Sequence, residues 1–116
     1  MIAIRNEDYF DELRKRRDKT AMTLEYVRKE QSIVDENKEW IDKAAYQSRR
    51  DLLDSLAEWY LDEATRIDDA LVRITEGRYG ICLGCLEAIE PHRLEATPEA
   101  VFCLECQKSR EALTNP

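Results

Sequence analysis

Glycine and proline are scarce in this chain, with three of each among 116 residues, and neither occurs before residue 77. These are the two residues that most often end or kink a helix. Residues 1–76 therefore contain no helix breaker, and we expect them to form two long helices.

The chain also lacks a long apolar run, and acidic residues stand near its N-terminus, where a signal peptide has its apolar stretch. Neither a membrane span nor a secretory signal is expected. The cysteines are expected to stay reduced, and the predicted compartment is the cytoplasm.

An excess of positive charge is absent as well: the formal net charge is −7, although 37% of the residues are charged. Binding to nucleic-acid phosphates needs a basic face, so direct binding to DNA or RNA is not expected. The high charged fraction indicates a large exposed surface, such as that of long helices.

All four cysteines lie in two Cys-x-x-Cys pairs: Cys82 with Cys85, and, after seventeen intervening residues, Cys103 with Cys106. This spacing is typical of a four-thiolate zinc site, so we predict one structural Zn²⁺ per chain. Such a closed site has no free position for a substrate. Two disulfides, or a thioredoxin-like redox pair, are the alternatives, but the contexts that they need are not indicated. His92, the single histidine, is not expected to bind the metal.

Apolar residues recur every three or four positions along two segments, which is typical of coiled-coil seams. The first seam is Phe10, Leu13, Arg17, Thr20, Leu24, Val27, Gln31, Val34, Lys38 and Ile41, and the second is Arg49, Leu53, Leu56, Tyr60, Glu63, Ile67, Ala70 and Ile74. Leu52, Trp59, Ala64 and Leu71 are expected to widen the second seam.

Weak helix formers between residues 37 and 42 predict a turn centred near Glu39–Trp40, which makes the two helices an antiparallel hairpin. This turn places Arg17 opposite Glu63 and Gln31 opposite Arg49. The second helix is expected to end at Glu76–Gly77, where glycine can adopt the left-handed conformation.

The predicted fold class is mainly α: a long antiparallel two-helix coiled-coil hairpin, then a small four-cysteine zinc finger and a short C-terminal helix. The expected domains are residues 1–76, with the tip near 37–44, and residues 77–116. Within the second domain, Tyr79 is expected to cover the metal site, residues 89–100 to form short extended pieces and a turn, and residues 103–113 to form the final helix.

Two sequence motifs around the cysteines resemble those of the DksA/TraR family of bacterial transcription regulators. They are Glu-Gly-Arg-Tyr-Gly-Ile at 76–81, directly before Cys82, and Arg-Leu-Glu-Ala-x-Pro at 93–98. The resemblance covers almost the whole chain. It implies a protein that binds RNA polymerase directly, without DNA, with the hairpin in the secondary channel and its tip near the active site.

The family pattern Asp-x-x-Asp-x-Ala at the hairpin tip aligns with residues 39–44, with Glu39 in place of the first aspartate. The resemblance therefore implies that Asp42, Ala44 and Glu39 contact polymerase. Trp40, a large aromatic residue far from any expected core, is a further candidate contact. Without the resemblance, Asp42 would be interpreted as an ordinary helix N-cap.

The chain departs from the family in two places. Leu86 follows Cys85 where glycine is common, and a left-handed conformation there costs roughly 1–2 kcal/mol. Some members also bind guanosine tetraphosphate, at positions that correspond here to Trp59, Glu63, Arg66, Thr97 and Gln107. Only Arg66 is cationic, so it is the one possible effector contact, and binding of this polyphosphate is doubtful.

Other classes of function fit the sequence less well. Adjacent carboxylates such as Asp68 and Asp69 have no nucleophile or histidine beside them, so no enzyme is expected. A zinc-stapled coiled-coil adaptor that does not act on polymerase is the main alternative. A nucleic-acid-binding zinc ribbon is weaker, because glutamates outnumber the two arginines, Arg78 and Arg93, between residues 77 and 106.

Overall fold

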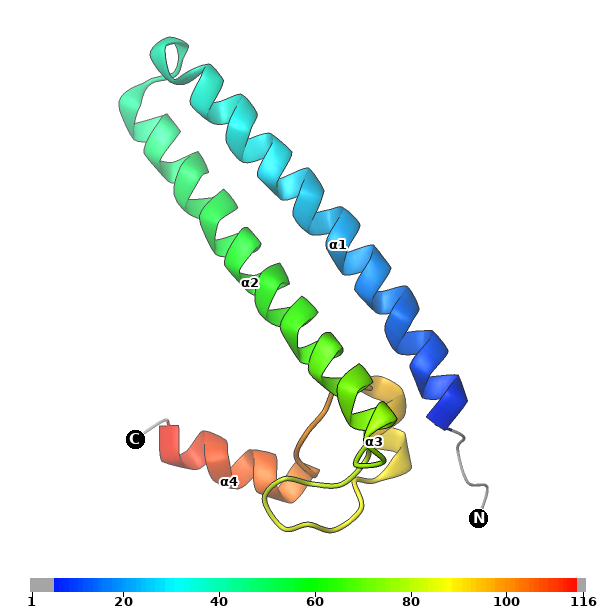
Figure 1. Cartoon of the computed structure of the whole chain (residues 1–116). Helices are drawn as coiled ribbons and strands as arrows, with labels where there is room; N and C mark the ends of the chain where they lie inside the picture. The colour runs from blue at the N-terminus through cyan, green and yellow to red at the C-terminus, as the bar shows by residue number, and fades with distance from the viewer. Residues whose placement is uncertain (1–5, 115–116) are drawn as a thin grey trace. The chain divides into compact units, whose positions relative to one another are not determined.

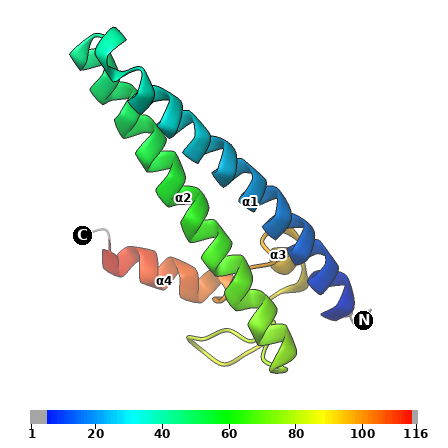
Figure 2. The same ribbon diagram turned by 45° about the horizontal axis from the view of Figure 1, so that its top comes forward.

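The computed structural model describes residues 6–114, and in this part the chain is mainly helical. The elements in chain order are α1 (Asn6–Glu36), the 3₁₀ helix η1 (Lys38–Trp40), α2 (Lys43–Thr75), α3 (Pro91–Ala96) and α4 (Leu104–Thr114) (Figures 1 and 2). The predicted fold class is confirmed. None of the helices described contains an apolar stretch long enough to cross a bilayer.

The structure divides into two compact units, and both long helices contribute to each of them. The hairpin unit is Arg16–Thr65. The finger unit combines the start of the chain, up to Lys15, with Arg66 and everything after it.

In the hairpin unit, α1 and α2 run antiparallel and side by side, joined through η1 (Figures 1 and 2). Its core is narrow: Val27, Val34 and Leu53 are buried, and Ile41, Tyr46, Leu56, Ala57 and Tyr60 pack against them half-buried. The predicted widening of this seam by Leu52 and Trp59 is wrong, because their side chains are 60% and 56% exposed. A two-helix unit has no third element that could cover those positions.

The predicted polar pair between Arg17 and Glu63 is wrong. Glu63 accepts a hydrogen bond from the Thr20 hydroxyl (3.5 Å), while Arg17 lies beside Asp18 (3.9 Å). Thr20 stands about one helical turn after Arg17 in the same seam, so the sequence pattern alone did not determine which of the two faces Glu63.

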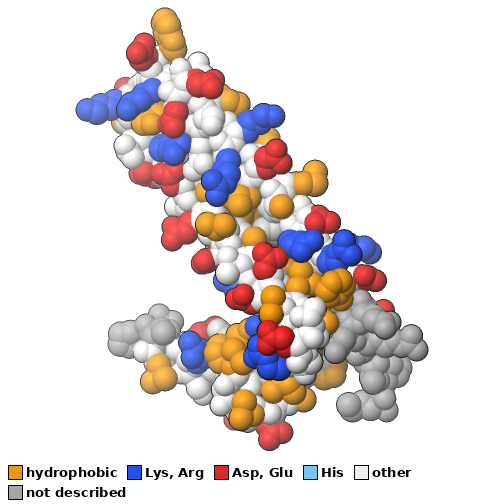
Figure 3. All heavy atoms as spheres, in the orientation of Figure 1, with side chains coloured by type: hydrophobic (Ala, Val, Ile, Leu, Met, Phe, Trp, Pro, Cys, Tyr) orange, Lys and Arg blue, Asp and Glu red, His pale blue; other side chains and the backbone are white. Residues whose placement is uncertain are grey.

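The predicted Gln31–Arg49 pair is also wrong. The Gln31 amide donates to Asp54 (2.9 Å), and Arg49 lies 3.8 Å from Glu30. Arg50 completes this polar group with contacts of 3.2 Å to both Asp35 and Asp54. All are exposed or half-exposed pairs, so each contributes little stability. Along the face drawn in Figure 3, basic and acidic side chains are interspersed on the hairpin.

The finger unit has the larger core. Leu13 of α1 and Ile67 and Ala70 of α2 are completely buried. They pack in one cluster with buried residues from the rest of the unit, namely Tyr9, Leu71, Tyr79, Cys82, Ile89, Leu94, Ala100 and Cys103.

The end of α2 matches the sequence prediction. Gly77 has φ +71°, a left-handed conformation that glycine adopts without a side-chain penalty. Its N–H donates to the Ile74 carbonyl (3.2 Å), and the Arg78 N–H donates to the Arg73 carbonyl (2.9 Å). These two bonds are the Schellman motif, which satisfies carbonyls that the helix end would leave without partners.

The predicted extended structure between residues 89 and 94 is wrong, because Pro91–Ala96 form helix α3. Proline at the first helical position is favourable, since its fixed φ suits a helix and its missing N–H would have no partner there. The N–H groups of Leu94 and Thr97 close the turns on the carbonyls of Glu90 and Arg93 (3.2 and 2.7 Å). The final helix, α4, lies where the sequence predicts it.

Candidate metal centre and hairpin tip

The finger unit brings the four cysteines together. The sulfur atoms of Cys82, Cys85, Cys103 and Cys106 all lie within 4.8 Å of one another, and those of Cys85 and Cys103 are 3.9 Å apart. A tetrahedral zinc ion with bonds of about 2.3 Å separates its sulfur ligands by about 3.8 Å, so this spacing fits a single ion. All four cysteines are free, which excludes the two-disulfide alternative in this structure.

Backbone N–H groups donate to two of the four sulfurs and favour the thiolate form of Cys82. The N–H groups of Gly84 and Cys103 both donate to Cys82 Sγ at 3.3 Å, and the N–H of Cys106 donates to Cys103 Sγ at 3.4 Å. Burial raises the pKa of Cys82, but these donors outweigh it and lower the pKa to about 6. The site is prepared to hold at least one thiolate before a cation arrives.

The neighbouring sulfurs act on Cys106 in the opposite direction. Its interactions with Cys103 and Cys82, together with burial, raise the pKa of Cys106 to about 12. Four thiolates cannot gather this closely without a positive charge among them. A divalent cation supplies that charge, and its binding releases the remaining protons.

Glycine at position 84 lets the loop between the first two cysteines pass close to Cys106. A Cβ added there would lie 3.0 Å from the Cys106 sulfur, which is tighter than an ordinary contact, so a larger residue would require Cys106 to shift. Leu86 has φ +63°, so it takes the strained left-handed conformation expected from its place after Cys85. Its N–H donates to the Cys82 carbonyl (2.9 Å) and so closes the turn around the metal site.

Tyr79 packs in the same core cluster as Cys82 and Cys103, beside the metal site. Its hydroxyl donates to the Pro98 carbonyl (2.7 Å), and its ring lies 5.2 Å from that of Tyr9. The single histidine, His92, is exposed on α3 and is not part of the cysteine group.

At the tip, Asp42 is the N-cap of α2. Its Oδ2 accepts hydrogen bonds from the N–H groups of Ala44 (3.1 Å) and Ala45 (3.2 Å). These are the second and third residues of the helix, where a capping side chain satisfies N–H groups that have no partner within the helix. The fold therefore gives Asp42 a structural role, whatever else it does.

The other residues predicted at the tip are solvent-exposed. Glu39 and Trp40 belong to η1, and Trp40 is 85% exposed, the highest value among the large apolar side chains of the hairpin unit. Ala44 is exposed in the first turn of α2. The turn thus presents a large aromatic side chain and two carboxylates to solvent.

The five positions compared with the effector site fall into two groups. Arg66, Thr97 and Gln107 line one cavity of the finger unit, whereas Trp59 and Glu63 belong to the hairpin unit. Two further cations, Arg73 and Arg93, line this cavity and were missed by the sequence analysis. The sequence could have indicated that Arg73 lies on the same face of the helix as Arg66, because it stands seven residues, or two helical turns, after Arg66.

Comparisons with known proteins agree with this geometry. Residues 77–112 match the prokaryotic DksA/TraR C4-type zinc finger. The structure is similar to that of transcription factor DksA2 from Pseudomonas aeruginosa, with a TM-score of 0.86 and 25% identity, over 96% of this chain and 86% of that one. It is also similar to the solution structure of the DnaK suppressor protein from Agrobacterium tumefaciens C58, with a TM-score of 0.61 and 28% identity, over 93% and 96% of the two chains.

One curated relative extends the similarity beyond the finger. An uncharacterized protein of Aquifex aeolicus (strain VF5) is 35% identical over 91 residues, which are 76% of this chain and 63% of that protein. The chain thus spans less than two thirds of that relative's length. With the zinc-finger match and the cysteine geometry, the predicted cofactor, one zinc ion per chain, is confirmed.

Proposed function

We propose that this chain, which belongs to the DksA/TraR family of C4-type zinc-finger proteins, regulates bacterial transcription initiation by binding RNA polymerase directly. In this proposal the hairpin enters the secondary channel, and the tip residues Glu39, Trp40, Asp42 and Ala44 act near the active site. The protein contributes no catalytic chemistry of its own and works in the cytoplasm, where the polymerase is.

The observation that carries the proposal is the tip itself. A soluble hairpin gains nothing in stability from an indole that is 85% exposed at its turn, and such a side chain is typical of a contact with a partner. Asp42 stands two residues away, with its carboxylate exposed to solvent while it caps α2. The similarity to a transcription factor over nearly the whole chain supports a partner in the transcription machinery.

The charge of Asp42 can be tested apart from its capping role. Asparagine caps helices about as well as aspartate, so Asp42→Asn should keep the fold and the zinc while it removes the charge. A charged acceptor makes hydrogen bonds about twice as strong as a neutral one, so the effect on initiation should fall by roughly tenfold. The readout is transcription in vitro with purified bacterial polymerase.

Asp51→Asn is the matched control. Asp51 is another exposed acid of α2, bonded only to Gln47 among the contacts described, and its loss should leave regulation unchanged. Both variants should still co-purify with polymerase. If the wild type fails to co-purify, the chain is instead a zinc-stapled adaptor, and if Asp42→Asn regulates fully, the tip charge has no part in the mechanism.

Guanosine tetraphosphate should add little to the effect. The cavity that contains Arg66, Thr97 and Gln107 is lined by three arginines, but also by Asp69, Glu99 and Glu111. A ligand with many phosphate charges needs a clear excess of cations. Transcription measured with and without the nucleotide tests this expectation.

A further inference from the structure

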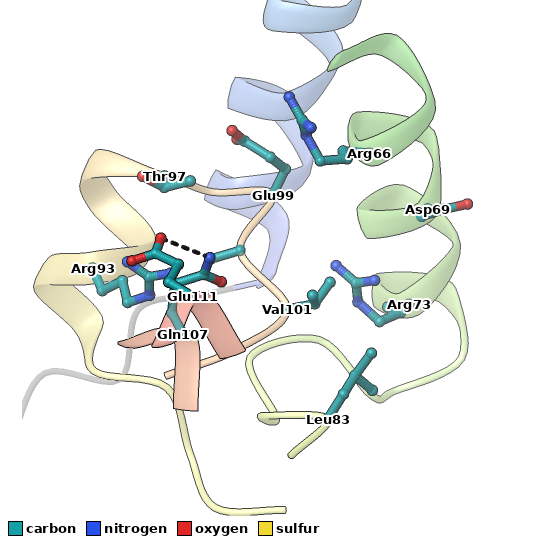
Figure 4. A pocket seen from close by; sticks show the side chains of 11 residues that line it. Arg66, Asp69, Arg73, Leu83, Arg93, Thr97, Glu99, Val101, Gln107 and Glu111 are labelled. Atoms are coloured by element: carbon teal, nitrogen blue, oxygen red, sulfur yellow. Dashed lines mark hydrogen bonds between the residues drawn. The ribbon is translucent and has the colours of Figure 1, made fainter. Parts of the chain in front are cut away.

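A cavity of about 610 Å³ lies within the finger unit, on the side of α2 that faces α4 and the segment before it (Figure 4). This volume is in the range of pockets that hold small organic molecules. Its charged lining consists of three arginines and three acidic residues: Arg66, Arg73, Arg93, Asp69, Glu99 and Glu111.

Two residues of this cavity, Glu99 and Arg73, have a buried polar atom without a hydrogen-bond partner, and the cation of the two is Arg73. It is only 8% exposed, and its Nη2 atom is completely buried without a hydrogen-bond partner. In Figure 4 its guanidinium extends from the last turns of α2 across the cavity toward Val101. A buried donor of this kind is rare, because buried polar groups almost always have a partner.

The charge of Arg73 is poorly compensated. Burial lowers its pKa, and the approach of Arg78 acts in the same direction, while Asp69 and Tyr79 counteract the shift only in part. Asp69 stands one turn earlier on α2, yet no ion pair joins it to Arg73 among the residues described. A buried charge without a partner destabilises the fold, so a ligand that pairs with it would bind favourably.

The other charges of the cavity limit the charge of that ligand. Arg93 already donates to the Phe102 carbonyl (2.8 Å), and Gln107 donates to Glu111 (3.1 Å). Three acidic residues balance the three arginines of the lining, so a ligand with several negative charges would be repelled. The lining also contains the Glu99 carboxylate, whose Oε2 is buried without a partner, so a single negative charge is the most that the one unpartnered guanidinium of Arg73 can hold here.

The surroundings of Arg73 indicate the rest of the ligand. Leu83, Ala100 and Val101 supply apolar walls, and Figure 4 shows Val101 next to the guanidinium and Leu83 further away on the same side. We propose that this cavity binds a small organic acid with one carboxylate and a short apolar chain, its carboxylate on Arg73. The planar fork of an arginine suits a carboxylate, because two N–H groups can donate to its two oxygens.

Butyrate is a suitable probe, with butyramide as its neutral counterpart and inorganic phosphate as a more highly charged anion. The experiment follows the amide signals of Leu83 and Val101 by NMR in the zinc-loaded full chain. Butyrate should shift both signals with saturation in the millimolar range, while butyramide and phosphate should bind at least roughly tenfold more weakly.

Two variants of α2 separate the proposed role from a structural one. Arg73→Met keeps the length of the side chain but removes the charge. It should weaken butyrate binding roughly tenfold or more, and the ligand-free protein should be at least as stable as the wild type, because an unpaired buried charge is gone. Arg66→Gln removes an exposed arginine from the same cavity and should leave butyrate binding within about threefold.

The wild type alone can overturn the proposal. If butyrate at roughly 50 mM shifts neither signal, or if butyramide shifts them equally, the cavity does not select a carboxylate. Equal binding by Arg73→Met, or a large loss of its stability without ligand, would show that Arg73 is a structural cation. If Arg73→Met does not fold, Arg73→Lys takes its place, and it should bind butyrate more weakly than the wild type because lysine lacks the planar fork.

Discussion

The hairpin unit and the finger unit share two helices but differ in how they are stabilised. The hairpin unit has three buried apolar residues, Val27, Val34 and Leu53, and exposed polar pairs around them. Among its described residues, the finger unit has eleven buried residues in one cluster and four cysteines around one metal position. The same helices thus carry a thin seam at one end and a packed core at the other, which assigns stability chiefly to the finger unit and leaves the tip free for contact with a partner.

Removal of the metal should produce the largest difference in structure between the two units. Cys103→Ser takes one ligand from the zinc site and one member from the core cluster. Because structural zinc contributes on the order of 10 kcal/mol to the folding of small fingers, we expect residues after Gly77 to lose their structure. Elemental analysis should find no zinc, while circular dichroism should show that α1 and α2 remain largely helical.

Chelation of zinc from the wild type is the control for this variant and should give the same spectrum. A Cys103→Ser protein that keeps one zinc per chain would show that the fourth ligand is dispensable. Complete loss of helicity would show that the thin seam of the hairpin unit cannot hold its two helices together without the finger unit.

Truncation of a buried side chain to alanine should lower the free energy of unfolding more in the finger core than in the hairpin seam. Ile67 is completely buried in the finger unit, and Ile67→Ala should lower the free energy of unfolding by roughly 3–5 kcal/mol. Leu53 is 8% exposed in the narrow seam, so Leu53→Ala should cost roughly 2–3 kcal/mol. Chemical denaturation measures both values.

Leu61→Ala provides the baseline, because Leu61 is half-exposed on the same helix and its truncation should change stability by less than about 0.5 kcal/mol. An equal cost for Ile67→Ala and Leu53→Ala would mean that the seam is as well packed as the finger core.

The smallest of these effects should be a gain in stability. Leu86 is 74% exposed and has φ +63°, so its side chain buries little while its backbone is strained. Leu86→Gly should raise the stability of the finger unit by roughly 0.5–1 kcal/mol, the relief of strain being partly offset by the entropy of glycine. Thermal unfolding of the zinc-loaded protein measures the change.

Leu83→Gly is the control, since Leu83 is a half-exposed leucine in the same loop and has no positive φ. It should lose stability. A loss in Leu86→Gly of the same size would mean that the Leu86 side chain packs more tightly than its exposure indicates.

Much of this fold could be predicted because it depends on features that are local in the sequence. The lack of glycine and proline before residue 77 gives the two long helices, Gly77 ends the second one, and the spacing of the cysteines gives the metal site. Asp42 could also be identified as a helix cap from its position alone.

The remaining features of the fold depend on which elements pack together, and this packing is not specified by local sequence patterns. The polar partners across the hairpin were wrong, because Thr20 and Arg17 both occupy seam positions that could face Glu63. Pro91 was interpreted as a turn residue, although a proline also fits the first turn of a helix. Arg73 could not be recognised as buried, because only the packing of the finger unit against α2 removes it from water.

Asp42 has a structural role as a helix cap and a proposed role as a contact with polymerase. The two roles tolerate different substitutions, and this difference can be tested genetically. The cap on Ala44 and Ala45 accepts several polar residues, since aspartate, asparagine and serine cap helices about equally well. The proposed contact with polymerase accepts only a carboxylate. A library of all substitutions at position 42, selected once for protein abundance and once for transcriptional effect, should therefore return two different sets of survivors, the second contained within the first.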